Sequence, residues 1–150
     1  MDEKPQLDEN TLEAIAEFGD WRPTALPEGY SEYVSNGSPS KYGGEGGYGY
    51  VYRTYVNDAG YTIQLEYEFW RGVISYENQV YVFRNYRQNE YTVTDLTVQG
   101  LPAGLVETLD GSPALLTWVR EGGDLVFKMR AENLTSEELL AVAESVALAP

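Results

Sequence analysis

The chain has 150 residues, 43% of them hydrophobic, and its 24 acidic and 10 basic residues give a formal net charge of −14. This length and apolar content predict a single globular domain over residues 1–150, and the negative charge disfavours a nucleic acid partner because phosphates would be repelled. Cysteine and histidine are both absent, which excludes disulfides, thiol nucleophiles, Cys/His zinc sites and every catalytic mechanism that needs an imidazole.

The N-terminal region predicts a short helix within residues 7–19, preceded by a frayed end over residues 1–6. Asp8 is one candidate for the N-cap, and Asn10 is the other, since a glutamate follows it three residues later. Gly19 is expected to end the helix, because glycine readily adopts the backbone conformation found after a helix C-terminus. The apolar face of this helix is expected to contain Leu12, Ile15 and Ala16.

A glycine-rich segment comes next. After a short strand near residues 30–35, the composition of residues 36–49 predicts a flexible loop, because glycine is unfavourable inside helices and strands. A phosphate-binding loop is the alternative interpretation. The segment lacks the Lys-Ser/Thr ending of such loops and no helix signal follows it, so a flexible connection is favoured.

The central part of the chain has the pattern of β-structure. Strands are expected at residues 50–56 and 61–69, joined by a short hairpin loop. In the second strand, aromatic and aliphatic residues alternate with polar ones, which predicts one face in the core and one face in water. Residues 73–76 and 80–83 are expected to form two further strands or one irregular strand, and residues 91–98 another.

The last third predicts three antiparallel strands, at residues 104–109, 114–120 and 125–130, followed by a helix. Thr135 can cap this helix, with Glu138 completing a capping box from the third helical position. An apolar stripe at helical spacing consists of Leu139, Val142, Ala143, Val146 and Ala147. The whole chain therefore predicts an α+β fold, an antiparallel β-sheet meander with an N-terminal and a C-terminal helix packed on one face.

Glu66 and Glu68 form the candidate catalytic pair, because they point to the same face of one predicted strand. Acid-only glycoside hydrolases place two carboxylates on either side of the bond that they cleave. Carboxylates two residues apart on a water-exposed strand face are also ordinary, and this second interpretation is favoured, so we expect no enzymatic activity and no catalytic residues. The acidic turns near residues 57–58 and 121–124 lack the ligand spacing of calcium loops, so we expect no metal site and no cofactor.

The segment over residues 70–91 mixes aromatic residues with arginines, although the chain as a whole is acidic. Aromatic residues and arginine are enriched at binding surfaces, which makes this segment the candidate site for a protein, peptide or lipid ligand. A half-exposed sheet face is the alternative interpretation of the same pattern. The candidate binding residues are Trp70, Arg71, Tyr81, Arg84 and Arg87.

Two C-terminal stretches, LTWVREGGDLVF at residues 116–127 and NLTSEELLAVAESV at residues 133–146, resemble the C-terminal signature of the domain of unknown function 4367 family. The Pro-Glu-Gly-Tyr run at residues 27–30 is similar to the start of such domains. The resemblance implies an extracytoplasmic domain of a membrane-anchored, anti-sigma-factor-like or lipoprotein-like protein of Gram-positive bacteria. It also implies an architecture similar to lipoprotein-carrier and sigma-regulator sensor domains, and it assigns no catalytic residue.

The sequence has no apolar run near the ~18 residues that a membrane-spanning helix needs, and its start lacks the features of a secretory signal. We therefore expect the domain to contact a membrane only through an N-terminal anchor that this chain lacks. The leading hypothesis is a non-enzymatic extracytoplasmic binding or sensor domain that recognises a peptide, lipid or envelope component. An acid-only hydrolase and a structural spacer or self-association domain are the alternatives.

Overall fold

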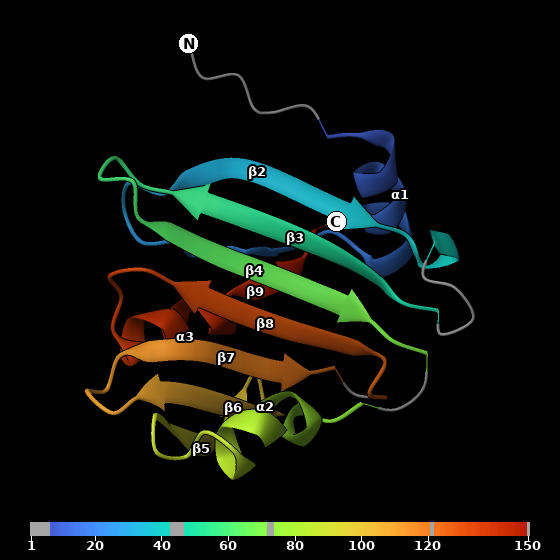
Figure 1. Ribbon diagram of the computed structural model, residues 1–150. Helices are drawn as coiled ribbons and strands as arrows, with labels where there is room; N and C mark the ends of the chain where they lie inside the picture. Colours follow the sequence, from blue (N-terminus) through green and yellow to red (C-terminus); the bar gives the residue numbers. More distant parts are fainter. Residues whose placement is uncertain (1–6, 43–46, 72–73, 121, 150) are drawn as a thin grey trace.

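The computed structural model describes residues 7–42, 47–71, 74–120 and 122–149. Within these residues, three α-helices accompany a seven-stranded antiparallel sheet and a two-stranded ribbon (Figure 1). The α+β fold class expected from the sequence is therefore confirmed. In chain order the elements are α1 (Glu9–Phe18), β1 (Trp21–Pro23), β2 (Ser31–Ser38), the 3₁₀ helix η1 (Ser40–Tyr42), β3 (Gly49–Val56), β4 (Thr62–Phe69), α2 (Tyr76–Asn85), β5 (Tyr91–Val98), β6 (Leu101–Thr108), β7 (Pro113–Val119), β8 (Leu125–Ala131), α3 (Ser136–Glu144) and β9 (Val146–Leu148).

The large sheet consists of two meanders that meet at its centre, in the strand order β2-β3-β4-β8-β7-β6-β5. The first meander contains β2, β3 and β4, and the second runs from β5 to β8. The helix α2 joins the two meanders in the chain, and β8 rather than β5 is the neighbour of β4, with Glu66 opposite Lys128. This pairing of distant segments brings Lys128 of β8 beside Glu66 and Glu68 of β4.

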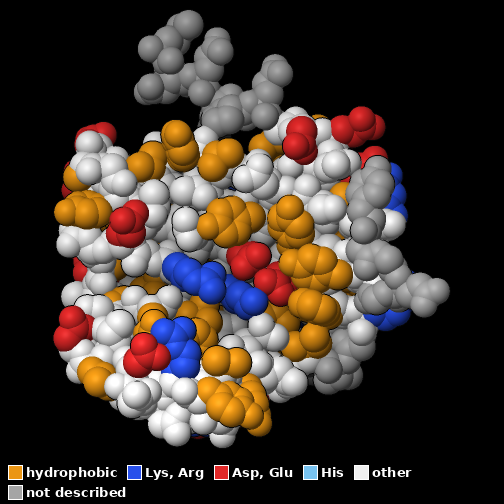
Figure 2. All heavy atoms as spheres, in the orientation of Figure 1, with side chains coloured by type: hydrophobic (Ala, Val, Ile, Leu, Met, Phe, Trp, Pro, Cys, Tyr) orange, Lys and Arg blue, Asp and Glu red, His pale blue; other side chains and the backbone are white. Residues whose placement is uncertain are grey.

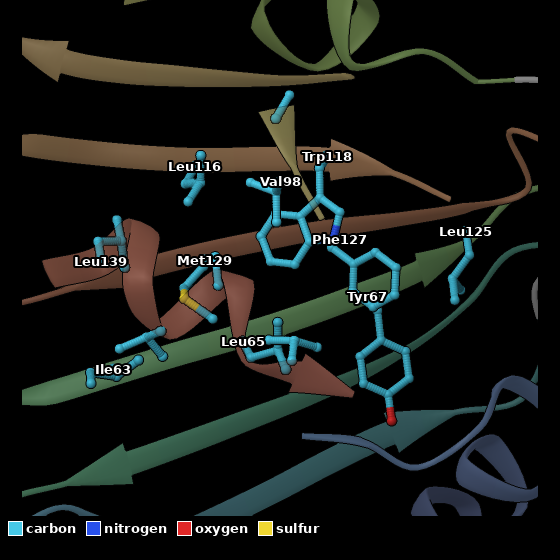
Figure 3. Packing of buried hydrophobic residues seen from close by; sticks show 14 of the residues in the cluster. Ile63, Leu65, Tyr67, Val98, Leu116, Trp118, Leu125, Phe127, Met129 and Leu139 are labelled. Atoms are coloured by element: carbon cyan, nitrogen blue, oxygen red, sulfur yellow. The ribbon is translucent and has the colours of Figure 1, made fainter. Parts of the chain in front are cut away.

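The main core lies on the face of the sheet that α1, α3 and the β1–β9 ribbon cover. Trp118 is 1% exposed and stacks on Phe127 with ring centroids 5.2 Å apart and an interplanar angle of 6°. Tyr67 and Met129 join the same cluster on the sheet side and Leu139 on the α3 side (Figure 3). The N-terminal and C-terminal helices therefore pack on one face, as the sequence predicts.

The strand expected at residues 80–83 is wrong, because the helix α2 spans Tyr76–Asn85. Residues 74–75 are not in a strand either, and residue 73 lies outside the described residues. The helix α2 lies on the other face of the sheet, over β5 and β6 (Figure 1). Val80 is fully buried there, and Tyr76 and Phe83 share its side of the helix in a small apolar cluster. Gly104 permits this close packing, since a Cβ on it would lie 3.0 Å from Val80 Cγ1.

Asp8 is the N-cap of α1, where it accepts a hydrogen bond of 2.8 Å from the backbone N–H of Thr11. The predicted inner face of this helix is correct only for Ile15, which packs against the main core, while Leu12 and Ala16 are exposed. Ala14 is buried against the sheet, whereas Leu12 is 54% exposed. The helix turns Ala14 rather than Leu12 towards β2 because the two elements lie very close together there. A Cβ on Gly37 of β2 would lie only 3.1 Å from Ala14 Cβ. The buried residues of α1 are Thr11, Ala14 and Phe18.

The expected glycine-rich loop is shorter than the sequence suggested. Strand β2 continues to Ser38 and η1 follows it, so that ordered elements occupy much of residues 36–42. The predicted flexibility of residues 43–46, and the predicted fraying of residues 1–6, lie outside the described residues.

The capping box of α3 is confirmed. Thr135 Oγ1 accepts a hydrogen bond of 3.1 Å from the backbone N–H of Glu138, whose side chain accepts one of 2.9 Å from the backbone N–H of Thr135. The helix ends at Glu144, earlier than the apolar stripe suggested. Val146 is buried, but it begins β9, which pairs with β1.

Replacing Thr135 with alanine should lower the free energy of unfolding by about 1 kcal/mol, the usual cost of losing an N-cap hydroxyl. Urea denaturation of both proteins measures this difference. Thr135→Ser keeps the hydroxyl and should retain most of the stability. Equal stability of the wild type and the alanine variant would show that the cap does not stabilise the domain.

Candidate functional site

The helix α2 covers the sheet only over β5, β6 and part of β7, and the remainder of that face has no covering element within the described residues (Figure 1). Acidic and basic side chains meet in the middle of this uncovered area, with hydrophobic side chains beside them (Figure 2). We call this area the open face. It contains Tyr48, Tyr50, Tyr52, Glu66, Glu68, Trp70, Lys128 and Arg130.

The register of β3, β4 and β8 builds the open face. Tyr52 lies opposite Glu66, and Glu66 lies opposite Lys128 on the next strand. Tyr50 lies opposite Glu68 one step further along. Since alternate residues of a strand point to the same side, these five side chains all project from the face opposite to the main core. Directly opposed side chains on neighbouring strands are in contact distance, so tyrosines and charges are interleaved.

Glu68 is buried, with 5% of its surface exposed, although the sequence suggested a solvated position. Lys128 Nζ lies 2.9 Å from its Oε1, and the indole Nε1–H of Trp70 donates a hydrogen bond of 2.9 Å to its Oε2. Hydrogen bonds to a charged acceptor are stronger than neutral ones. Both carboxylate oxygens are therefore occupied, and Glu68 acts as an anchor for its two neighbours.

Glu66 has a different environment. It is half-buried, and within the described residues it forms no ion pair with a lysine or an arginine. Burial raises the pKa of Glu66, the adjacent charge of Glu68 raises it further, and the nearby Lys128 and Arg130 counteract this only in part. Glu66 is thus the carboxylate of the open face whose negative charge is least compensated.

The aromatic rings of the open face are held in place. Trp70 is fixed at one edge by its hydrogen bond to Glu68 and packs on Tyr48, with ring centroids 4.7 Å apart. Tyr50 follows at 6.0 Å from Tyr48. Burial, together with the charges of Glu68 and Glu66, raises the pKa of Tyr48 to about 12, so its hydroxyl stays neutral under ordinary conditions. The rings form a row beside the charged centre.

A polar cleft extends the open face towards β2. Its volume is about 490 Å³, and Tyr50 and Tyr52 form one wall. Asn36 and Ser38 of β2 and Asp8 at the start of α1 contribute polar groups to the other side. A ligand on the tyrosines would therefore also reach amide, hydroxyl and carboxylate groups. Among the described residues, no group of three or more Asp and Glu side chains is arranged to hold a metal ion.

The structure separates the residues that the sequence suggested for binding. Trp70 lies on the open face, and the side chain of Arg71 lies beside Gly47. Arg84 pairs with Asp95 of β5 at 2.9 Å, and Arg87 pairs with Glu90 at 2.8 Å. Tyr81 is exposed on α2 and contacts Tyr86. Of the five suggested residues, only Trp70 belongs to the open face, and Arg84 and Arg87 are engaged by local carboxylates.

Sequence reasoning missed Tyr48, Tyr50, Tyr52 and Lys128 as members of one surface. The alternation of the three tyrosines at the start of a strand is a signal that points to a common face. Lys128 had no such signal, because its position beside Glu68 depends on the pairing of β4 with β8, which are distant in the chain.

The domain of unknown function 4367 (DUF4367) family model matches residues 20–146, which is most of the chain. The match includes β1 to β8, α2, α3 and the first residue of β9, and it contains the whole open face. Searches of the curated proteins and of the solved structures find no match. By the extent of this family match, the chain belongs to the DUF4367 family.

Proposed function

We propose that this chain is a non-enzymatic binding or sensor domain whose open face recognises a peptide or another envelope component. The observation that carries the proposal is the position of Trp70, held between Glu68 and Tyr48 on a face that no described element covers. Preorganised aromatic residues with polar groups around them are typical of binding sites, because little side-chain freedom is lost when a ligand arrives.

An acid-only hydrolase is the second candidate, favoured by the raised pKa of Glu66 beside the anchored Glu68. Two details support binding more strongly. Glu66 and Glu68 project side by side from one strand, whereas a glycosidase places its two carboxylates on either side of the bond that it cleaves. In addition, both oxygens of Glu68 already accept hydrogen bonds, from Lys128 and Trp70.

A structural spacer would need only an ordinary solvated surface. The open face instead contains a buried carboxylate, a lysine that neutralises it, and a row of packed rings. Charged groups are costly to bury, and such an arrangement is better explained by recognition than by solubility. This comparison supports a binding role over a spacer role.

We further propose that the domain acts outside the cytoplasmic membrane and is tethered in the full-length protein. The resemblance to the DUF4367 family supports this location, since it implies an extracytoplasmic domain of a membrane-anchored, anti-sigma-factor-like or lipoprotein-like protein. The net charge of −14 on the chain would repel the domain itself from anionic lipid head groups. Among the residues that the structure describes, none of the helices is both long and apolar enough to cross a bilayer.

Binding by the open face should depend on Trp70. In co-sedimentation with Gram-positive cell-wall fragments and with lipid vesicles, we expect retention of the wild-type domain on at least one envelope fraction. Trp70→Ala should weaken this retention by about thirtyfold, corresponding to ~2 kcal/mol for a central aromatic contact. Tyr86→Ala removes an exposed ring from the C-cap residue that follows α2 and serves as the matched control, with no expected effect.

The same incubations test the rival functions. Release of soluble sugar that depends on Glu66 would favour the hydrolase. Equal retention of the wild type and Trp70→Ala would move the binding surface elsewhere. No retention of the wild-type domain on any fraction would contradict the binding role.

A further inference from the structure

The open face has two carboxylates and two cations, but they do not pair one to one. Lys128 is engaged by Glu68, and Arg130 lies opposite Gln64 rather than Glu66 in the β4–β8 register. Arg130 is exposed and forms no ion pair within the described residues. Glu66 is consequently left as a half-buried carboxylate without a cation in contact. A ligand that supplied a cation at this point would complete the arrangement.

The ring opposite Glu66 favours the same kind of ligand. Tyr52 faces Glu66 across the β3–β4 pair, with Tyr50 two residues further along its strand. The face of a tyrosine ring attracts ammonium and guanidinium groups, most strongly where water is partly excluded. A carboxylate beside such a ring therefore offers a cation two attractive partners at once, and it offers an anion none.

The charge of the whole chain acts in the same direction. A net charge of −14 attracts cationic partners over distances comparable to the screening length and speeds their encounter. Long-range attraction cannot select a site by itself, because it acts on the whole surface. The partly compensated charge of Glu66 and the ring of Tyr52 provide the local element that selects one site.

We infer that the open face binds a basic peptide, with a lysine or arginine side chain placed between the carboxylate of Glu66 and the ring of Tyr52. The inference rests on the proposed binding function and names the chemistry of its ligand. The neighbouring rings of Tyr50 and Trp70 accommodate the remainder of the peptide. Glu68 is a positioning residue, since it fixes the indole of Trp70 rather than meeting the cation.

Protonation of Glu66 should control this binding. The charged and titratable groups facing it are Glu68 on its own strand, Lys128 and Arg130 on β8, and Tyr52 on β3. Because the pKa of Glu66 is raised, the carboxylate takes up a proton at a higher pH than an ordinary glutamate does. The affinity for a cation should be constant above this pKa and fall as the pH decreases through it.

The test uses an oligolysine peptide amide and the same peptide with every side-chain amine acetylated. Calorimetric titration of the wild-type domain should show binding of the oligolysine and little binding of the acetylated form. Glu66→Gln should weaken the affinity for oligolysine by about tenfold, which corresponds to about 1.4 kcal/mol of binding free energy. Glu137→Gln removes the same charge from the exposed surface of α3, away from the open face, and should change the affinity little.

Two further variants keep the inference falsifiable. Tyr52→Phe retains the ring and should retain affinity, whereas Tyr52→Leu should lose it. Equal effects of Glu66→Gln and Glu137→Gln on the affinity would show that the peptide binds only through the net negative charge of the domain, which would overturn the inference. Equal binding of the acetylated peptide would also overturn it. If either of these results were obtained but the domain were still retained on an envelope fraction in a Trp70-dependent manner, the proposed binding function would stand. Only the identification of the ligand as a basic peptide would then be wrong.

Discussion

Replacing Asp20 with asparagine should lower the free energy of unfolding by about 3 kcal/mol, because it leaves a buried arginine without its main counterion. The side chain of Arg53 is completely buried on the core side of the sheet. Its guanidinium donates to the carboxylate of Asp20 and, at 3.3 Å, to Glu32. Removing one partner of a buried ion pair is costly because the remaining charge cannot be solvated.

The pH dependence of this effect provides an independent check. Burial alone would raise the pKa of Asp20, but the hydrogen bond from Arg22 and the charge of Arg53 outweigh it, and the pKa falls below the ordinary 3.8. A carboxyl with a lowered pKa stabilises the fold above its unfolded pKa and loses this contribution as the pH falls through its folded pKa. The difference between wild type and Asp20→Asn should therefore be constant near neutral pH and shrink below about pH 3.8.

Two control variants isolate the buried charge in urea denaturation. Arg22→Ala removes the more exposed partner of Asp20 and should cost less than about 1 kcal/mol. Arg53→Met in the Asp20→Asn background should recover much of the lost stability, since an apolar side chain then replaces the unpaired charge. Glu32 is partly exposed and keeps its hydrogen bond from Ser35. Failure of the methionine to recover stability would show that the buried charge is not the cause.

Replacing Trp118 with alanine should destabilise the domain by about 3–5 kcal/mol, the usual cost of truncating a buried aromatic residue. Its ring is 1% exposed and stacks on Phe127, which in turn contacts the rings of Trp21 and Tyr67. The alanine would leave a cavity at the centre of this group. Trp118→Phe should cost clearly less, and Tyr86→Ala, at a 70% exposed position, should have almost no effect. A cost below about 1 kcal/mol for Trp118→Ala would contradict the central position of this ring.

The sequence predicted those elements whose formation depends on neighbouring residues in the chain. The β3–β4 hairpin follows from period-two alternation, and the α3 capping box follows from Thr135 and Glu138 at the required spacing. The helix α2 escaped prediction because its tyrosines and valines favour strands. Its stability depends on packing Val80 over Gly104, a contact that requires knowledge of β6. The three-residue strands β1 and β9 are likewise defined only by each other.

The candidate site could be predicted only in part for the same reason. Trp70 was suggested by the local density of aromatic residues and arginines, yet its place on the open face results from Glu68 and Tyr48. Two of the arginines that distinguished residues 70–91, Arg84 and Arg87, form ion pairs with carboxylates near α2. Lys128 comes from a strand about 60 residues away in the chain, as the contact with Glu68 shows. Pairing across such a distance is not encoded in any short pattern.

Binding by the open face can be mapped with an amide hydrogen-exchange footprint of the domain, recorded with and without the envelope fraction that retains it. If the open face is the binding surface, exchange should slow upon binding in residues 48–52, 64–70 and 126–130. Exchange in α1 and α3, on the other side of the sheet, should remain unchanged. Protection confined to α2, or to the side of the sheet that α1 and α3 cover, would show that the open face is not the binding surface.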